Sequence, residues 1–223
     1  MSDAPSAGRT QRWIVIAVAL VLIGALGFAV GRFTMFGTQS AASTPGTSSP
    51  EAGFSRDMQA HHAQAIELAM EIYRKTDDPE LRALSYDIAT SQAAQRGEMF
   101  DWLVQWGLPQ AGGPMMQWMD TASGHQHSGT SSEPMTDEQA REAMGMASAA
   151  EITALQSATG TEADCRFLAL MIRHHQGAIP MAEALLELGS DPRALEVAEA
   201  MKTGQTAEID AMTSMQKRLG CSG

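Results

Sequence analysis

Aromatic residues, cysteine and positive charge are all scarce in this chain of 223 residues. Only 5% of the residues are aromatic, whereas Ala and Met are plentiful (16 Met), and this bias favours helices over sheets. The formal net charge is -11. Because binding to nucleic-acid phosphates needs a basic face, we expect no nucleic-acid partner. With 44% apolar residues, the chain is long enough for one globular domain with a real core.

Two metal-site motifs are also missing from the chain. Di-iron helical bundles carry Glu-x-x-His on paired helices, and many zinc proteases carry His-Glu-x-x-His on one helix. Neither spacing occurs anywhere in the sequence. The sequence therefore supports neither a di-iron centre nor a zinc-protease site.

A single long apolar run lies near the N-terminus, from Trp13 to Val30. Its length of about 18 residues is just enough to cross a bilayer as a helix. Arg9 and Arg12 precede it, which favours a cytoplasmic N-terminus and an exported C-terminal part. We therefore expect a cytoplasmic segment over residues 1–12 and a transmembrane anchor over residues 13–36, which makes a single-pass protein of the cell membrane.

The alternative to an anchor is a signal peptide that is cleaved at the small residues 40–42, which would make the protein secreted. In both cases the domain works outside the cytoplasm. Residues 37–50 are rich in Ser, Thr, Ala, Gly and Pro, so we expect a flexible tether there.

Residues 51–219 contain an internal repeat with an offset of 113 residues, as from Phe54 to Phe167. Such self-similarity marks a duplicated structural unit. We assign residues 51–107 to repeat 1, residues 108–135 to a Met/His loop and residues 136–219 to repeat 2. The matched positions include Phe54/Phe167, Met58/Met171, His61/His174, His62/His175, Asp78/Asp191, Gln92/Gln205 and Gly107/Gly220.

Each repeat has the pattern of a helical hairpin that is interrupted at an Asp-Pro pair, where Pro suits the first turn of the next helix. We expect long helices over residues 54–75, 79–106, 161–188 and 192–219. The capping-box spacing at Thr136 predicts one more helix, through about residue 156. Two hairpins joined by a crossover predict an all-α four-helix bundle.

The repeated motif combines a His-His pair with a Met one turn before it. On a helix, positions i, i+3 and i+4 share a face, so Met58 lies beneath His61 and His62. Adjacent histidines are about 100° apart in projection, so one should face inward and the other a neighbouring helix or a bundle end. The second copy has Met171, His174 and His175, with Met181 seven residues after His174.

Imidazole and thioether ligands suit copper, as Cu(I) or as Cu(II) at a His-dominated site. A lone buried His is more often a hydrogen-bonded core residue, and Met is commonly core filler. Two equivalent copies favour ligation instead, because four buried imidazoles each need a partner. We therefore predict a copper site formed by the two motifs.

The loop between the repeats carries a second group of soft ligands. These are Met115, Met116, Met119, His125 and His127. We expect this segment to capture copper. The alternative is that Met115, Met116, Trp118 and Met119 fold onto the bundle.

The two cysteines, Cys165 and Cys221, open and close the second repeat. In an antiparallel hairpin these points lie at the same end, so a disulfide is geometrically reasonable in an exported protein. Two free thiols, or Cys165 as a small core residue, are the alternatives.

Residues Phe167 to Ala182 (FLALMIRHHQGAIPMA) resemble the signature of a bacterial family, domain of unknown function 305. The resemblance covers about residues 51 to 219. It implies a ferritin-like four-helix bundle, often exported, that in some members binds copper and supports copper tolerance. The first copy departs from the pattern at Ala63-Gln64 and at Leu68, which stands where the second copy has Met181.

These observations predict a membrane-anchored, extracytoplasmic protein, not an enzyme, that sequesters copper or transfers it. One alternative is a ferritin-like metal-dependent oxidoreductase. The other is a metal-free interaction module of the cell envelope, in which the histidines are core groups. The sequence identifies no protein partner.

Overall fold

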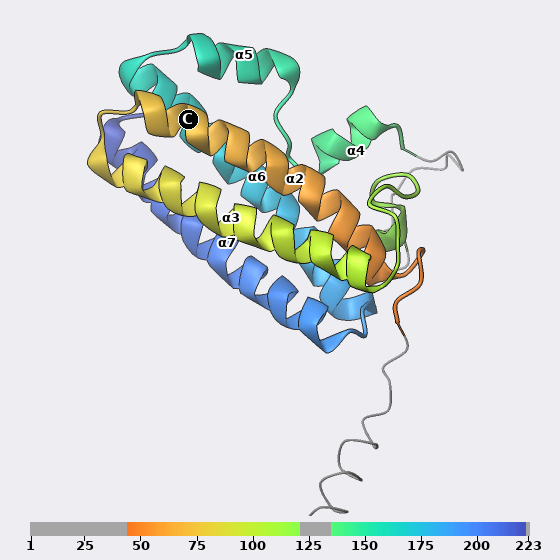
Figure 1. Ribbon diagram of the computed structural model, residues 1–223. Coiled ribbons are helices and arrows are strands. Elements are labelled where there is room, and N and C mark those ends of the chain that lie inside the picture. The colour runs from red at the N-terminus through yellow and green to blue at the C-terminus, as the bar shows by residue number, and fades with distance from the viewer. Residues whose placement is uncertain (1–43, 121–134, 222–223) are drawn as a thin grey trace, which may run out of the picture. The chain divides into compact units, whose positions relative to one another are not determined.

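Every regular element that the computed structural model describes is helical (Figure 1). The structure describes residues 44–120 and 135–221, and this part of the chain contains no strand. The elements, labelled as in Figure 1, are α2 (Pro50–Lys75), α3 (Pro79–Gln105), the 3-10 turn η1 (Gln117–Met119), α4 (Asp137–Ala143), α5 (Ala149–Ser157), α6 (Gly160–Leu188) and α7 (Pro192–Leu219). The all-α prediction is confirmed.

The two repeats fold as two similar helical hairpins, α2 with α3 and α6 with α7. Their second helices begin in the same way. The carboxylate of Asp78 accepts a hydrogen bond from the backbone N–H of Leu81 (2.9 Å), and that of Asp191 accepts one from Ala194 (3.0 Å). In each case Pro occupies the first helical position, where its missing N–H is not needed.

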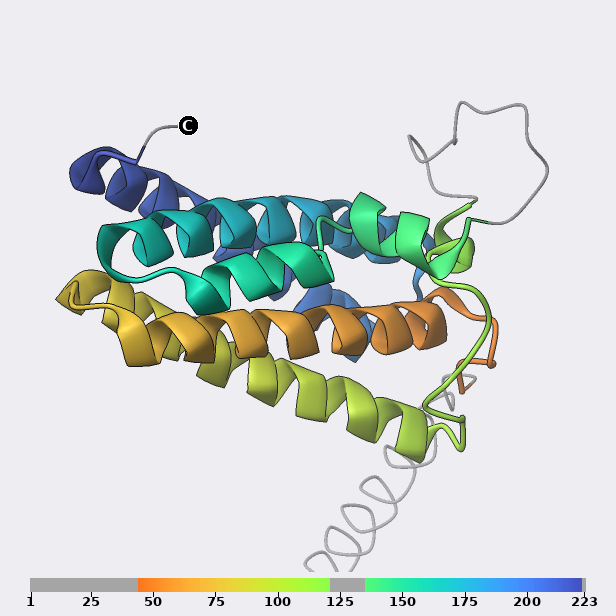
Figure 2. The ribbon, with the colours of Figure 1, turned by 90° about the horizontal axis from the view of Figure 1, so that it is seen from above.

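Helices α2 and α6 form the central pair and run side by side in opposite directions (Figure 2). Helix α3 packs on α2, and α7 packs on α6. Ion pairs join the two outer helices near both ends: Arg193 of α7 contacts Glu98 of α3, and Arg218 contacts Asp78. Since α2 and α6 also contact each other directly, the two hairpins form one bundle.

The crossover between the hairpins differs from the single helix expected over residues 136–156. The capping box at Thr136 is present, but α4 ends at Ala143 because Gly145 adopts a left-handed conformation (φ 71°). A second capping box, Ser148 with Glu151, then starts α5. Helices α4 and α5 of the crossover lie along the central pair of helices (Figure 2).

A disulfide closes the second hairpin, as predicted. Cys165 in the second turn of α6 is bonded to Cys221, just beyond the end of α7, with 5.4 Å between their Cα atoms. The equivalent positions of the first hairpin carry Ala52 and Leu108, so only one of the two hairpins has this cross-link.

The cytoplasmic segment (1–12), the anchor (13–36) and the first half of the tether (37–50) lie outside the described residues, which begin at Thr44. Among the helices that the structure does describe, none combines the length and the apolar character that crossing a membrane would require. The bundle, from Pro45 onward, is a compact unit by itself.

Candidate metal centre

The four motif histidines form one layer in the interior of the bundle, where α2 and α6 cross. All four are 0% exposed to solvent. His61 of α2 and His174 of α6 lie face to face, with ring centroids 3.6 Å apart and planes inclined by 32°. Within each pair the centroids are 6.3 Å apart. The repeat thus brings its two copies together at the centre of the molecule.

The second histidine of each pair faces the outer helix of its own hairpin. Nε2 of His62 lies 2.7 Å from Oε1 of Gln95 on α3. Nε2 of His175 lies 2.6 Å from Oε2 of Glu208 on α7. One histidine inward and one toward a neighbouring helix is the arrangement that the helical spacing predicted.

Sequence reasoning missed Gln95 and Glu208. Both stand 33 residues after the histidine that they contact. They are therefore related by the same repeat offset as the histidines, and that equivalence was the available signal.

Oxygen acceptors fix the proton positions on three of the four rings. Nε2 of His61 lies 3.0 Å from the backbone carbonyl oxygen of Met144. The Nε2 atoms of His62 and His175 face side-chain oxygens in the same way. Because these oxygens accept, each Nε2 donates its hydrogen and each Nδ1 keeps its lone pair. All three Nδ1 atoms, and both ring nitrogens of His174, are buried without a hydrogen-bond partner among the described residues.

Five of the eight ring nitrogens in the layer therefore lack a partner. A buried polar group left unpaired destabilises a fold by about 1–3 kcal/mol. Lone pairs of neutral imidazole that point into the interior are what a borderline or soft metal ion binds. The donor chemistry of these nitrogens suits such an ion, and the layer is not a core in which every histidine has a hydrogen-bond partner among the described residues.

Burial keeps the imidazoles of His61, His62 and His174 uncharged near neutral pH. Desolvation lowers the pKa of His61 to about 3, helped by the neighbouring His62 and His175, and it lowers the pKa of His62 to about 4. The pKa of His174 is also well below its ordinary value, first through desolvation and then through its neighbours. Neutral rings compete for metal without first losing a proton.

The crossover covers the histidine layer, and the residues at which the two repeats differ hold it there. Gln64 binds the backbone of Ala147 twice, by donation to its carbonyl (2.9 Å) and acceptance from its N–H (2.6 Å). The equivalent residue in repeat 2 is Gly177, whose missing Cβ would lie 2.0 Å from the carbonyl oxygen of Met144. This close approach lets the Met144 carbonyl reach His61.

An ion pair fastens the same crossover to α6 beside the histidines. The guanidinium of Arg173 binds both carboxylate oxygens of Glu151 on α5, at 2.7 and 2.8 Å. This contact lowers the pKa of the Glu151 carboxyl to about 2. Arg173 immediately precedes His174, so the clamp and the histidine layer share one turn of helix.

The motif methionines are fully buried but lie on opposite sides of the layer. Each Met precedes its histidines by one turn, and α2 and α6 are antiparallel, so Met58 and Met171 point to different ends of the bundle. Met58 packs in the same hydrophobic cluster as Met181, and Met171 packs in the other cluster. Within the described residues, no three His, Cys, Asp or Glu side chains are arranged together as a metal-ligand group.

The described part of the Met/His loop folds onto the bundle. Met116 and Met119 are buried in the cluster that contains Met58, with Met115 partly buried against it. The carboxylate of Asp57 accepts hydrogen bonds from the N–H of Met116 (2.8 Å) and from the indole of Trp118 (2.9 Å).

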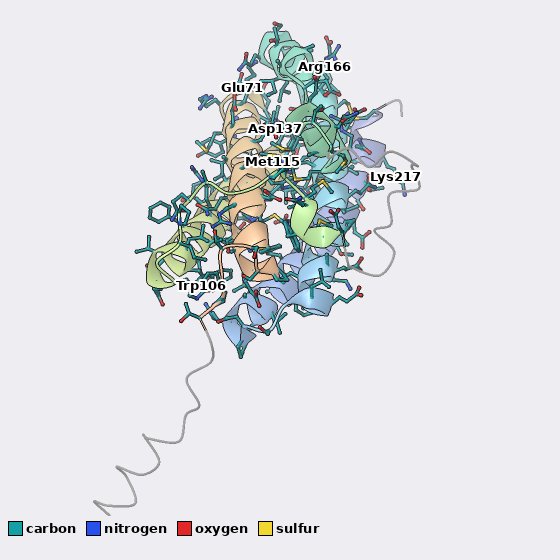
Figure 3. The ribbon with its side chains drawn as sticks, turned by 90° about the vertical axis from the view of Figure 1, so that its right-hand side faces the viewer. Glu71, Trp106, Met115, Asp137, Arg166 and Lys217 are labelled. Atoms are coloured by element: carbon teal, nitrogen blue, oxygen red, sulfur yellow. A yellow bond between two sulfur atoms is a disulfide. The ribbon has the colours of Figure 1, made fainter. Side chains whose placement is uncertain are left out.

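Figure 3 looks onto this end of the bundle, where η1 lies against α2 and α6. The three methionines therefore pack as the alternative interpretation of the loop describes. His125 and His127, the other candidate ligands of the loop, lie outside the described residues.

The fold and the site define an all-helical bundle of two similar hairpins, with a buried layer of four histidines where the hairpins meet. The family model "Domain of unknown function (DUF305)" matches residues 51–216, and the chain belongs to this family. A search of curated proteins finds no match.

Solved structures agree with the family. A DUF305 protein from Streptomyces coelicolor is 35% identical, with a TM-score of 0.68, and the match covers 78% of this chain and 95% of that one. A DUF305 fragment from Deinococcus radiodurans is 32% identical, with a TM-score of 0.61 and coverage of 76% and 96%. CopM in its Cu(II)-bound form is 26% identical, with a TM-score of 0.55 and coverage of 76% and 97%.

Proposed function

We propose that this protein binds copper through its histidine layer and sequesters the metal or transfers it. The ligand candidates are His61, His62, His174 and His175, with the thioethers of Met58, Met171 and Met181 as further donors. The observation that carries the proposal is the set of five buried ring nitrogens without a partner. Copper matches these donors because it accepts both imidazole and thioether.

The solved structures support the choice of metal. CopM, which has the same fold, is described in a Cu(II)-bound form, and also in Cu(I)-bound and silver-bound forms. Silver is monovalent and soft like Cu(I), so a fold that accepts all three ions suits mixed imidazole and thioether donors. In this chain the loop residues Met115, Met116, Met119, His125 and His127 are secondary candidates.

We place the bundle outside the cytoplasm, with residues 13–36 as a membrane anchor or, after cleavage, as a removed signal. The disulfide supports this location, because such bonds persist in oxidising compartments. The Streptomyces coelicolor relative is described as a candidate secreted protein. The ferritin-like character that the family resemblance implied stays a prediction.

The test is a competitive titration of the purified full-length protein with Cu(I) and Cu(II) against chelators of known affinity. His174→Ala/His175→Ala should lose bound copper. His125→Ala/His127→Ala removes the matched pair of histidines from the loop, so it shows how much copper the loop binds independently of the histidine layer. Far-UV circular dichroism shows whether each variant keeps its helices. Unchanged stoichiometry and affinity in a folded His174→Ala/His175→Ala variant would leave the histidines as structural groups and reject the proposal.

A further inference from the structure

The two halves of the histidine layer differ by one charge. His62 and His175 are equivalent in the repeat, and so are their partners Gln95 and Glu208. The two contacts have nearly the same geometry, at 2.7 and 2.6 Å through the same ring nitrogen. One partner is a neutral amide and the other is a carboxylate. The two contacts therefore have nearly the same geometry and differ only in the charge of the partner.

That charge changes what the opposite face of the ring can bind. A carboxylate that accepts the Nε2 hydrogen of an imidazole fixes the tautomer and makes the other nitrogen a better donor to a metal. In His175 that other nitrogen, Nδ1, is buried and has no hydrogen-bond partner. Glu208 also supplies a negative charge close to the layer, which offsets more of the energy of burying a divalent ion than of a monovalent one.

The second half also has more ring nitrogens available. Both nitrogens of His174 and one of His175 lack a partner, whereas His61 and His62 each offer one. The difference arises because the Met144 carbonyl accepts a hydrogen bond from His61, whereas within the described ranges 44–120 and 135–221 no group pairs with His174. A neutral imidazole keeps one lone pair, so each half offers two, but in the second half either nitrogen of His174 can supply it. Two lone pairs beside a carboxylate suit Cu(II), and two beside a neutral amide suit Cu(I).

We propose that Glu208 sets the metal preference of the layer, so that the His174–His175 half holds Cu(II) and the His61–His62 half, paired with neutral Gln95, favours Cu(I). Glu208 acts through His175 and is a positioning residue. This inference rests on the proposed copper function and adds that the two halves prefer different oxidation states of copper. The alternative is that Glu208 only pins α7 to α6.

Exchanging the two partners tests the inference. Glu208→Gln makes the second half resemble the first, and Gln95→Glu makes the first half resemble the second. Competition titrations would measure the affinity of each variant for Cu(II) and for Ag(I), a monovalent probe that does not change its oxidation state. Glu208→Gln should weaken Cu(II) binding by about 10–100-fold, as loss of a partner to a ligating histidine does, and should leave Ag(I) affinity within about twofold.

Gln95→Glu should strengthen Cu(II) binding at the first half, and the double exchange should restore one strong Cu(II) site. Glu208→Asp, which keeps the charge, should recover most of the Cu(II) affinity. A structural role alone predicts a lower melting temperature with equal changes for both metals, and that result would overturn the inference. Wild-type protein that binds no copper would overturn the proposed function itself, whereas wild type that binds copper with an unaffected Glu208→Gln variant would overturn only the inference.

Discussion

Burial determines the protonation of His61 and His62 and thereby contributes to the acid sensitivity of the metal-free protein. In an unfolded chain an imidazole has a pKa near 6.5, but desolvation lowers the pKa of His61 to about 3 and of His62 to about 4. A histidine whose pKa is lower in the folded state makes its full contribution to the free energy of unfolding above pH 6.5, where the ring is neutral in both states. That contribution is lost as the pH falls toward the folded pKa, because the unfolded chain takes up the proton first.

We therefore predict that the free energy of unfolding of the metal-free protein falls steadily from pH 7 to pH 5, where exposed carboxyl groups stay ionised. For His62 alone the loss over the whole interval from pH 6.5 to about 4 is on the order of 3 kcal/mol. Urea denaturation at several pH values measures it. His62→Gln should flatten the dependence, and a wild-type profile that is already flat would contradict the assignment of neutral buried rings.

At the level of single elements, the close contact between the crossover and α6 is the most sensitive feature. A Cβ at position 177 would lie 2.0 Å from the carbonyl oxygen of Met144, and backbone cannot move away as a flexible side chain can. Gly177→Ala should lower the free energy of unfolding by about 1–3 kcal/mol, as overpacking does. It should also expose the histidine layer, because the displaced carbonyl is the one that binds His61.

Gly204→Ala is the matched control for that experiment. Gly204 is also inside a long helix, α7, but apart from the adjacent backbone of that helix no atom of the described residues lies within 4 Å of the Cβ that the substitution would add. Alanine there should stabilise the protein by up to about 1 kcal/mol, because glycine is the poorer helix former. Urea denaturation compares the two variants, and equal effects at both positions would argue against a tight crossover contact.

The boundaries of the long helices could be predicted from local signals. Asp78 and Asp191 cap the second helix of each hairpin, and Gly220 ends the last one in a left-handed conformation (φ 70°). The break at Gly145 also had local signals that the prediction of one helix overlooked, because Ser148 and Glu151 have the capping-box spacing. Its consequence is tertiary and has no local signal: the glycine turns the chain so that the Met144 carbonyl meets Gly177.

The histidine layer was predictable only in part, because some of its contacts depend on tertiary structure. The helical period predicts that one ring of each pair faces inward, but it does not determine that the inward rings are those of His61 and His174. The contact with the Met144 carbonyl depends on the crossover, whose position is not encoded near either motif. The departures at Gln64 and Gly177 weakened the sequence resemblance of the two copies, yet in the structure they are the residues that hold the crossover.

For the whole molecule, duplication supplies the scaffold, and the differences between the copies make the two halves chemically unequal. Met181 occupies the position that Leu68 has in the first repeat, and Met201 the position of Ile88. Both methionines lie in the hydrophobic cluster that also contains Met144 of the crossover. Thioether groups are therefore concentrated at one end of the bundle, and this asymmetry parallels the charge difference between Gln95 and Glu208.

The disulfide is a third difference between the halves, and its removal should separate stability from metal binding. Cys165 and Cys221 are 56 residues apart in sequence, and cross-linking a loop of that length stabilises a fold by about 4 kcal/mol in the chain-entropy model. Cys165→Ser/Cys221→Ser should lower the free energy of unfolding by a comparable amount, measured by urea denaturation. A reductant should do the same to the wild type and should not affect the variant.

Copper binding should respond much less than stability does in the same variant. Cys165 precedes His174 by nine residues, more than two turns of α6, so the bond lies outside the histidine layer. At temperatures where the Cys165→Ser/Cys221→Ser variant remains folded, its affinity for Cu(II) should stay within about threefold of the wild type, because the rings are positioned by Gln95, Glu208 and the crossover and by nothing in the bond. A large loss of affinity in the folded variant would mean that the α6–α7 hairpin needs its cross-link to hold His174 and His175 in register, and that the layer is less rigid than its burial indicates.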